Sequence, residues 1–142
     1  MAVVAIAIMG AFFVVVATLF ATSGSATADL GGALPTAATV GRNLEVDVGY
    51  DNTGNGVINS TCILVAVQGP LQVSSVTFQG LDVERVVGGK ACGGSLNGQE
   101  TISVRIVLVP TRAGTATLSL TPANGSTALG AGLSGRIAIA AS

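Results

Sequence analysis

Two cysteines are the side chains with the most definite chemistry in this sequence. Cys62 and Cys92 are its only cysteines, and an even number of cysteines in a small chain is typical of a disulfide formed in an oxidising compartment. A bridge between them would close a loop of roughly 30 residues and stabilise the fold by about 3.7 kcal/mol in the chain-entropy model. The alternative is two buried free thiols. We predict the disulfide.

A run of polar residues, Asp51-Asn52-Thr53-Gly54-Asn55-Gly56, partly matches a calcium-binding loop. Asp51 and Asn55 fit the pattern, but Cys62 occupies the twelfth position, where a bidentate glutamate is needed. Because Asn-Gly readily adopts positive φ, the same run suits a hairpin loop. We favour the hairpin and predict no metal site.

Paired carboxylates at Asp82 and Glu84 could bind a cation or perform acid–base chemistry, since residues two apart on a strand share a face. Arg85 and Lys90 lie close by in the sequence. Cross-strand ion pairs on a solvated outer face are therefore the favoured interpretation.

Two N-x-[ST] sequons offer acceptors for N-glycosylation, one at Asn59 and the other at Asn124. The sequon at Asn124 falls in a predicted turn and is the better acceptor, whereas the one at Asn59 opens a predicted strand. Both remain candidate modification sites.

The composition argues against catalysis and against nucleic-acid binding. The chain has no His, and charged residues make up only 9% of it, with a net charge of −1; a soluble domain typically has about 25% charged residues. Without His the usual proton-transfer group near neutral pH is missing, and no G-x-S-x-G turn presents a nucleophile. No basic patch could neutralise phosphates. We expect no enzyme, no cofactor and no nucleic-acid partner.

The N-terminal segment, residues 1–22, carries no charge, and its first 21 residues are apolar except for the hydroxyl of Thr18; the first ionisable side chain is Asp29. As a helix these 21 residues would be about 32 Å long, enough to cross a bilayer core. Apolar residues cover every face, so lipid or other apolar helices must surround it. The side chains expected to make these contacts are Val3, Val4, Ile6, Ile8, Phe12, Phe13, Val14, Val15, Val16, Leu19 and Phe20.

Three interpretations of this segment stay open. It could be a secretory signal, since Ala26-Thr27-Ala28 forms an A-x-A cleavage site, although the basic n-region is absent and the apolar run is long. It could be an uncleaved membrane anchor, with no Lys or Arg before it to set the orientation. It could also be the polymerising tail of a filament subunit.

The third interpretation is a family resemblance. The chain resembles mature type IV pilins and archaellins, whose basic leader is removed so that the protein starts on its apolar segment, as Met1 does here. Small residues such as Ala5, Gly10 and Ala17 would let neighbouring tails pack closely. Bacterial type IV pilins usually carry Glu where this chain has Ala5, so the resemblance favours the archaeal branch.

Beyond a Gly/Ser/Thr/Ala linker at residues 23–41, the hydrophobic period changes to two. In the run from Leu44 to Tyr50, apolar residues alternate with Glu45 and Asp47, which is typical of a half-buried strand. Strands are predicted at 44–50, 59–67, 72–78, 82–87, 101–109, 115–121 and 136–140. The expected fold is an N-terminal hydrophobic α-helix with an all-β immunoglobulin-like sandwich head at residues 42–142.

Together these features predict a structural subunit of an extracellular, cell-surface pilus-like filament, serving adhesion or motility. What the resemblance implies is a homopolymer whose precursor sits in a membrane and is assembled by pilus machinery. The alternative is an exported or membrane-anchored immunoglobulin-like envelope, S-layer or binding domain, with residues 1–28 as signal or anchor.

Overall fold

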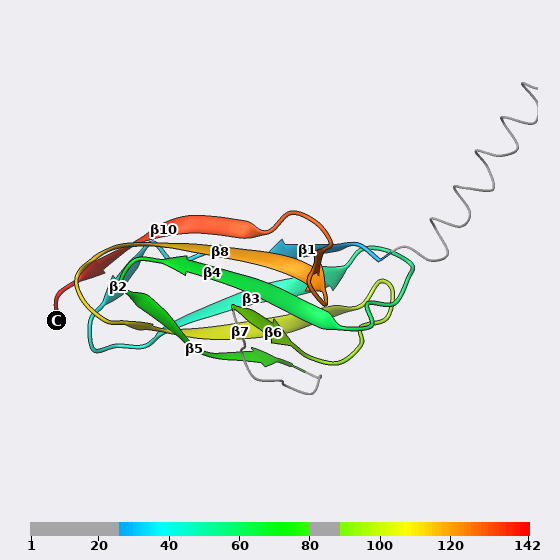
Figure 1. Cartoon of the computed structure of the whole chain (residues 1–142), viewed down its shortest axis with the longest axis horizontal. Helices are drawn as coiled ribbons and strands as arrows, with labels where there is room; N and C mark the ends of the chain where they lie inside the picture. The colour runs from blue at the N-terminus through cyan, green and yellow to red at the C-terminus, as the bar shows by residue number, and fades with distance from the viewer. Residues whose placement is uncertain (1–25, 80–88) are drawn as a thin grey trace, which may run out of the picture.

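The described part of the chain is a β-sandwich made of two packed sheets (Figure 1). The structure, a computed structural model, describes residues 26–79 and 89–142. Sheet A has four strands in the order β1 (Ala28–Gly31), β3 (Leu44–Asn52), β7 (Thr101–Pro110) and β5 (Leu71–Phe78). Sheet B has the order β2 (Ala37–Thr39), β10 (Leu133–Ala140), β8 (Gly114–Asn124), β4 (Thr61–Gln68) and β6 (Lys90–Cys92), and β9 (Thr127–Ala128) pairs with β8.

The long strands form because apolar and polar residues alternate along them. In β3, Val46, Val48 and Tyr50 are buried while Glu45 and Asp47 are exposed. Successive side chains of a strand point to opposite faces, so each long strand has one face in the core and one in water. The core therefore fills the space between the sheets, and its largest fully buried side chains are Tyr50, Phe78, Ile58, Ile63, Leu96, Ile106, Leu108, Leu118, Leu120 and Ile137.

The order of the strands is that of an immunoglobulin-like sandwich. Sheet A corresponds to strands A, B, E and D of that fold, while β10, β8 and β4 correspond to G, F and C. The first strand is split between the sheets, since β1 pairs antiparallel with β3 whereas β2 pairs parallel with β10. The predicted immunoglobulin-like sandwich is therefore present.

The predicted fold class is wrong in its other part, the N-terminal α-helix. All regular elements in residues 26–79 and 89–142 are strands, so the fold as described is all-β. The period of two along these strands, interrupted by Gly and Pro, supports strands and leaves no helical stripe. Residues 1–22, where the helix was expected, lie outside the described residues. Within the described ranges no helix has the length and apolar character needed to cross a membrane.

The sandwich begins earlier in the chain than predicted. β1 and β2 both fall within residues 23–41, which were expected to form an irregular linker. They are too short to display a clear alternation, and the ladder with β3 is what holds β1: Ala28 and Leu30 are buried while Asp29 is exposed. Ala28 and the rest of β1 therefore belong to the folded domain.

Most of the other predicted strands are present, with shifted ends. β3, β4, β5, β7, β8 and β10 overlap the predicted ranges. The strand expected at 82–87 lies outside the described residues. β6 was missed, because it has only three residues and lies outside every predicted strand.

The predicted disulfide joins Cys62 to Cys92. It links two neighbouring strands of sheet B: Cys62 on β4 lies directly opposite Cys92 on β6. β6 has only three residues and forms the edge of its sheet. The bond therefore fastens a short edge strand that few backbone hydrogen bonds hold in place.

Removing this bond should destabilise the domain. Replacing Cys92 with Ala is expected to lower the free energy of unfolding by about 3 to 4 kcal/mol, mainly because the unfolded chain loses a cross-link. Urea unfolding of the full chain in detergent measures this change. Reduction of the wild type should give a similar loss, and reducing agent should leave the Cys92→Ala variant unaffected. Equal unfolding midpoints for oxidised and reduced wild type would contradict the prediction.

Candidate functional site

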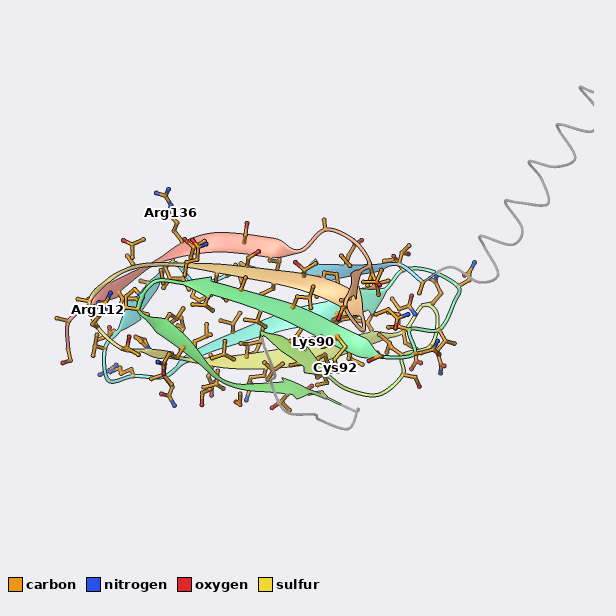
Figure 2. All side chains as sticks on the ribbon, viewed as in Figure 1. Lys90, Cys92, Arg112 and Arg136 are labelled. Atoms are coloured by element: carbon orange, nitrogen blue, oxygen red, sulfur yellow. A yellow bond between two sulfur atoms is a disulfide. The ribbon has the colours of Figure 1, made fainter. Side chains whose placement is uncertain are left out.

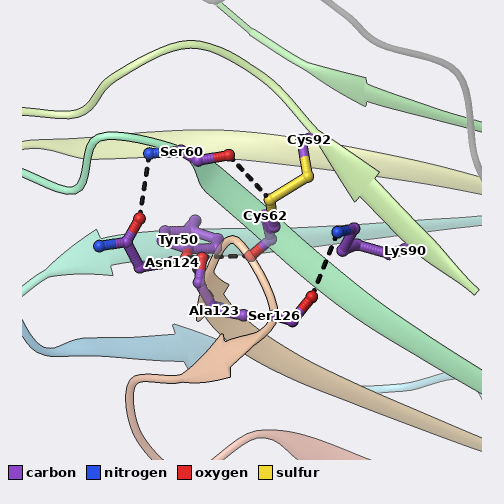
Figure 3. The surroundings of a disulfide bond; sticks show 8 residues. All are labelled: Tyr50, Ser60, Cys62, Lys90, Cys92, Ala123, Asn124 and Ser126. Atoms are coloured by element: carbon purple, nitrogen blue, oxygen red, sulfur yellow. Dashed lines mark hydrogen bonds between the residues drawn. A yellow bond between two sulfur atoms is a disulfide. The ribbon is translucent and has the colours of Figure 1, made fainter.

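A buried tyrosine connects the two sheets next to the disulfide. Tyr50 extends from β3 in sheet A, and its hydroxyl lies 3.0 Å from the carbonyl oxygen of Cys62 and 3.1 Å from that of Ala123. The same oxygen accepts a hydrogen bond from the Ala123 amide at 3.2 Å. Cys62 and Ala123 are paired residues of β4 and β8 (Figure 3). One hydroxyl therefore bridges sheet A to two strands of sheet B.

The environment of Tyr50 keeps its phenol neutral. The side chain is fully buried, and burial raises the pKa of Tyr50 to about 12, although the hydrogen bond with the Ala123 backbone lowers it in part. Shifted pKa values often mark functional sites. Here the hydroxyl is hydrogen-bonded to backbone groups inside the core, so the raised pKa of Tyr50 reflects a structural role.

A second buried polar side chain organises the end of the sandwich. The amide nitrogen of Asn52 donates to the carbonyl oxygens of Gly56, Leu96 and Asn97 at 2.9–3.2 Å, and its side-chain oxygen accepts from the Gly54 amide. Asn52 is completely buried. Its amide thus ties the β3–β4 loop to the segment that precedes β7.

Gln99 joins the same two loops from the outside. Its side-chain nitrogen donates to the carbonyl oxygens of Thr53 and Gly54 at 2.9 and 3.0 Å. Gln99 has a φ of 66°, and a Cβ on neighbouring Gly98 would lie 2.6 Å from the Asn55 carbonyl oxygen. The backbone is therefore shaped to bring the two loops together.

The run from Asp51 to Gly56 serves this loop contact. It does not form the predicted hairpin, because β3 lies in sheet A and β4 in sheet B, so the loop crosses between sheets. No group of three or more His, Cys, Asp or Glu side chains in the described residues could hold a metal ion.

The two sequons lie side by side at one end of sheet B. Thr61 pairs with Asn124 across β4 and β8, and the Asn124 side-chain oxygen accepts a hydrogen bond from the Ser60 amide at 3.1 Å (Figure 3). Asn59 is exposed, and it lies in the loop before β4 where a strand was expected to begin. Asn124 is partly buried and is the last residue of β8, which was expected to end before it.

Three residues of the remaining predicted polar site, Asp82, Glu84 and Arg85, lie outside the described residues. Lys90 starts β6 and donates a hydrogen bond to the Ser126 hydroxyl at 3.3 Å. In the described part of the chain, the carboxylate of Asp51 accepts a hydrogen bond from the Thr101 hydroxyl at 3.1 Å and that of Asp47 accepts one from Arg105 at 2.9 Å, both at exposed positions of sheet A.

The charged side chains are divided unequally between the sheets. Asp29, Glu45, Asp47 and Asp51 all point outward from sheet A, where Arg105 is the one basic strand residue among those described. Arg105 donates to Asp47 at 2.9 Å, and this contact raises its pKa. Both side chains are exposed, so the pair adds little stability. The outer face of sheet A is therefore acidic.

Sheet B has the opposite character. Its described strands contain no acidic residue, but they carry Lys90 and Arg136, and Arg112 lies in the β7–β8 turn at the end of the sandwich (Figure 2). Hydroxyl and other small side chains cover most of its outer surface. We call this surface the hydroxyl face; it consists of Ala66 and Gln68 of β4, Thr115, Thr117, Ser119 and Thr121 of β8, and Ser134 and Arg136 of β10.

Sequence reasoning missed the roles of Tyr50, Asn52 and Gln99. The role of Tyr50 had one signal in the sequence: it is a lone Tyr near the end of an alternating strand, and a buried Tyr hydroxyl usually has a hydrogen-bond partner. Nothing local identified that partner, since Ala123 lies 73 residues away in the chain. The hydroxyl face could have been read from the alternation of Thr and Ser with Ala and Leu in residues 114–121.

The comparisons with known proteins agree with this architecture. The cohesin module of a family 33 glycoside hydrolase from Clostridium perfringens is 16% identical, with a TM-score of 0.60 over 83% of this chain and 100% of that module. A CARDB domain from Pyrococcus furiosus, solved in complex with di-metal ions, is 17% identical, with a TM-score of 0.57 over 85% of this chain and 97% of that one.

A β-glucosidase from Listeria innocua also contains a similar domain, at 14% identity and a TM-score of 0.53, but this covers only 16% of the enzyme's chain. No protein-family model and no curated protein sequence matches the chain. At these identities the likeness shows the fold alone, and a sandwich of this fold also occurs as a small part of an enzyme.

The Tyr50 network makes stability sensitive to high pH. The pKa of this phenol is about 12 in the fold and about 10 in an unfolded chain. The contribution is therefore complete below pH 10 and is lost as the pH rises towards 12, by about 2 to 3 kcal/mol in all. Urea unfolding of the full chain between pH 8 and pH 12 measures this loss.

The variant Tyr50→Phe provides the control. At neutral pH it should cost about 1 to 3 kcal/mol, because the amide of Ala123 and the carbonyl of Cys62 lose a buried partner. It should also abolish Tyr50's share of the alkaline loss. A Tyr50→Phe variant that is as stable as the wild type, with an unchanged alkaline transition, would show that the hydroxyl does not hold the sheets together.

Proposed function

We propose that the chain is a non-catalytic interaction domain of the cell envelope, retained at the outer surface by its apolar N-terminal segment. The observation that carries this proposal is the position of the A-x-A sequence. Ala26-Thr27-Ala28 was the candidate site of signal cleavage, which would leave a mature protein beginning at Asp29. The structure shows that this sequence runs into the first strand of the sandwich.

Residues 27 and 28 are integral to the fold. Ala28 is 1% exposed, pairs with Asn52, and donates from its amide to the Leu129 carbonyl at 3.4 Å. Thr27 accepts a hydrogen bond from the Thr53 amide at 2.9 Å, and its hydroxyl contacts that of Thr53. Cleavage after Ala28 would remove these contacts and cut β1 at its first residue. The fold thus favours a chain that continues from the apolar segment into β1.

The disulfide supports the extracellular part of the proposal, since such bonds persist in oxidising compartments. The absence of a catalytic role is supported by the surfaces. In the described residues, the buried polar side chains with strong hydrogen bonds, Tyr50 and Asn52, contact backbone groups of the domain itself. What the domain offers to other molecules is its two outer sheet faces.

The N-terminus of the protein isolated from producing cells tests retention. We expect the species with the intact sandwich to keep residues upstream of Ala28 and to partition into the membrane or into an assembled envelope fraction. Intact-mass analysis and N-terminal peptide mapping measure this directly. A soluble mature form that begins at Asp29 would contradict retention.

From the charge distribution we infer that the partner is a second copy of the same chain. The acidic outer face of sheet A on one copy is complementary to the hydroxyl face with Arg136 on the next. Few charges on the hydroxyl face would have to lose water on docking, so the desolvation cost on that side of the contact is low. Because the two faces are different surfaces on opposite sides of the sandwich, the contact is heterologous and can repeat from copy to copy.

Charge reversal tests this contact in the full chain. Arg136→Glu and Glu45→Arg should each weaken self-association, and a mixture of the two variants should restore it, because each then supplies the face that the other lacks. Light scattering in detergent at low and high salt measures the association, which salt should weaken. Arg112→Glu is the matched control, since it changes the same charge in the β7–β8 turn. Equal association of all three variants would contradict the proposal.

A finer form of this proposal is that the repeated contact belongs to a pilus-like extracellular filament. It is supported by the uncharged apolar segment at residues 1–21, whose small residues would allow close packing between copies. Electron microscopy of material sheared from producing cells separates the two forms: filaments that contain the chain support the finer one, and a sheet or scattered anchored copies support the envelope domain alone.

A further inference from the structure

The sequon at residues 59–61 contains a hydroxyl that the fold does not use. Thr61 opens β4 and is 0% exposed, and its Oγ1 is buried without a hydrogen-bond partner. Its backbone is satisfied, since the amide donates to Gly94 and the carbonyl accepts from Gly93. Leaving a buried hydroxyl unpaired is unfavourable, and Val has the same shape without the polar atom. Folding therefore gives no reason for Thr at this position.

The neighbouring sequon differs in this respect. The Asn124 side-chain oxygen accepts from the Ser60 amide, and the Ser126 hydroxyl accepts from Lys90. Both polar side chains of that sequon thus have partners in the folded domain. Asn59, in contrast, is exposed, and no hydrogen bond of its side chain is recorded. The polar side chains of the Asn124 sequon therefore hold neighbouring segments together, whereas Asn59 and the Thr61 hydroxyl have no such role in the fold.

We propose that Asn59 is the N-glycosylated residue of this chain and that Thr61 is retained because the glycosyltransferase reads it. The donor would be a sugar joined through its anomeric carbon to a lipid phosphate. The Asn59 amide nitrogen forms the bond to that carbon and loses one proton, while the carbon–oxygen bond to phosphate breaks and its electron pair leaves with the phosphate. No oxidant or reductant is involved.

The burial of Thr61 also sets the order of events. In the folded domain β4 is paired with β8 and β6, and the disulfide lies one residue further along at Cys62. A transferase cannot reach the Thr61 hydroxyl in that state. Glycosylation therefore precedes closure of β4 into sheet B, and the sugar then lies at the exposed loop before β4, away from the centre of the hydroxyl face.

Peptide mass mapping of the full chain from producing cells tests the proposal. We expect the peptide that contains Asn59 to carry a sugar and the one that contains Asn124 to be unmodified. Asn59→Gln should lose the sugar with little change in the unfolding midpoint, because the side chain is exposed. Thr61→Ser should keep the sugar, although occupancy can fall.

The variant Thr61→Val tests the loss of glycosylation and the change in stability separately. It should lose the sugar completely and, when compared with unglycosylated Asn59→Gln protein, should raise the unfolding midpoint, because the unpaired hydroxyl is gone. An unmodified Asn59 in the wild type, or a sugar only on Asn124, would overturn the proposal. The proposal rests on export of the chain, but its readouts do not depend on anchoring or self-association, so either of those can fail while glycosylation of Asn59 stands.

Discussion

The single hydroxyl of Tyr50 is the polar link on which the arrangement of the two sheets depends. Sandwich sheets otherwise meet through apolar side chains, which favour contact but specify relative position only through shape. The Tyr50 hydroxyl lies within hydrogen-bond distance of Cys62 and Ala123, on paired positions of β4 and β8. Because leaving this buried hydroxyl unpaired would cost free energy, it favours the arrangement in which Tyr50 of sheet A faces Cys62 and Ala123 of sheet B. Asn52 extends this order to the loops at the same end.

The disulfide involves Cys62, the same residue of β4 that Tyr50 contacts. Cys62 accepts from Tyr50 through its carbonyl oxygen and bonds to Cys92 through its sulfur. The edge strand β6, the central strand β4 and the opposite sheet are thereby connected through one residue. These links leave the two outer faces chemically different, one acidic and one rich in hydroxyl groups. That division gives the domain two unlike surfaces, which suits a module that joins other molecules in a repeated way.

The sequence predicted much of the sandwich because its long strands carry a regular alternation. Leu44 to Tyr50 could be placed correctly from the period alone, and the disulfide from the number of cysteines. β1, β2 and β6 could not be predicted, because three or four residues do not display a period and their partners are distant in sequence. The function of the Asp51–Gly56 run was also hidden, because the partners of Asn52 come from residues 96 and 97. The pilus-like role rests on the apolar segment and stays a proposal.

The central claim is that this domain is located outside the cell and stays attached there. The most direct measurement adds a protease to intact producing cells, quenches thiol–disulfide exchange with acid before lysis, and then labels the free thiols of the denatured protein. The account predicts that Cys62 and Cys92 are oxidised and unlabelled, and that the protease removes the domain from intact cells or cuts it at exposed loops. Reduced cysteines in a protein that the protease reaches only after lysis would contradict it.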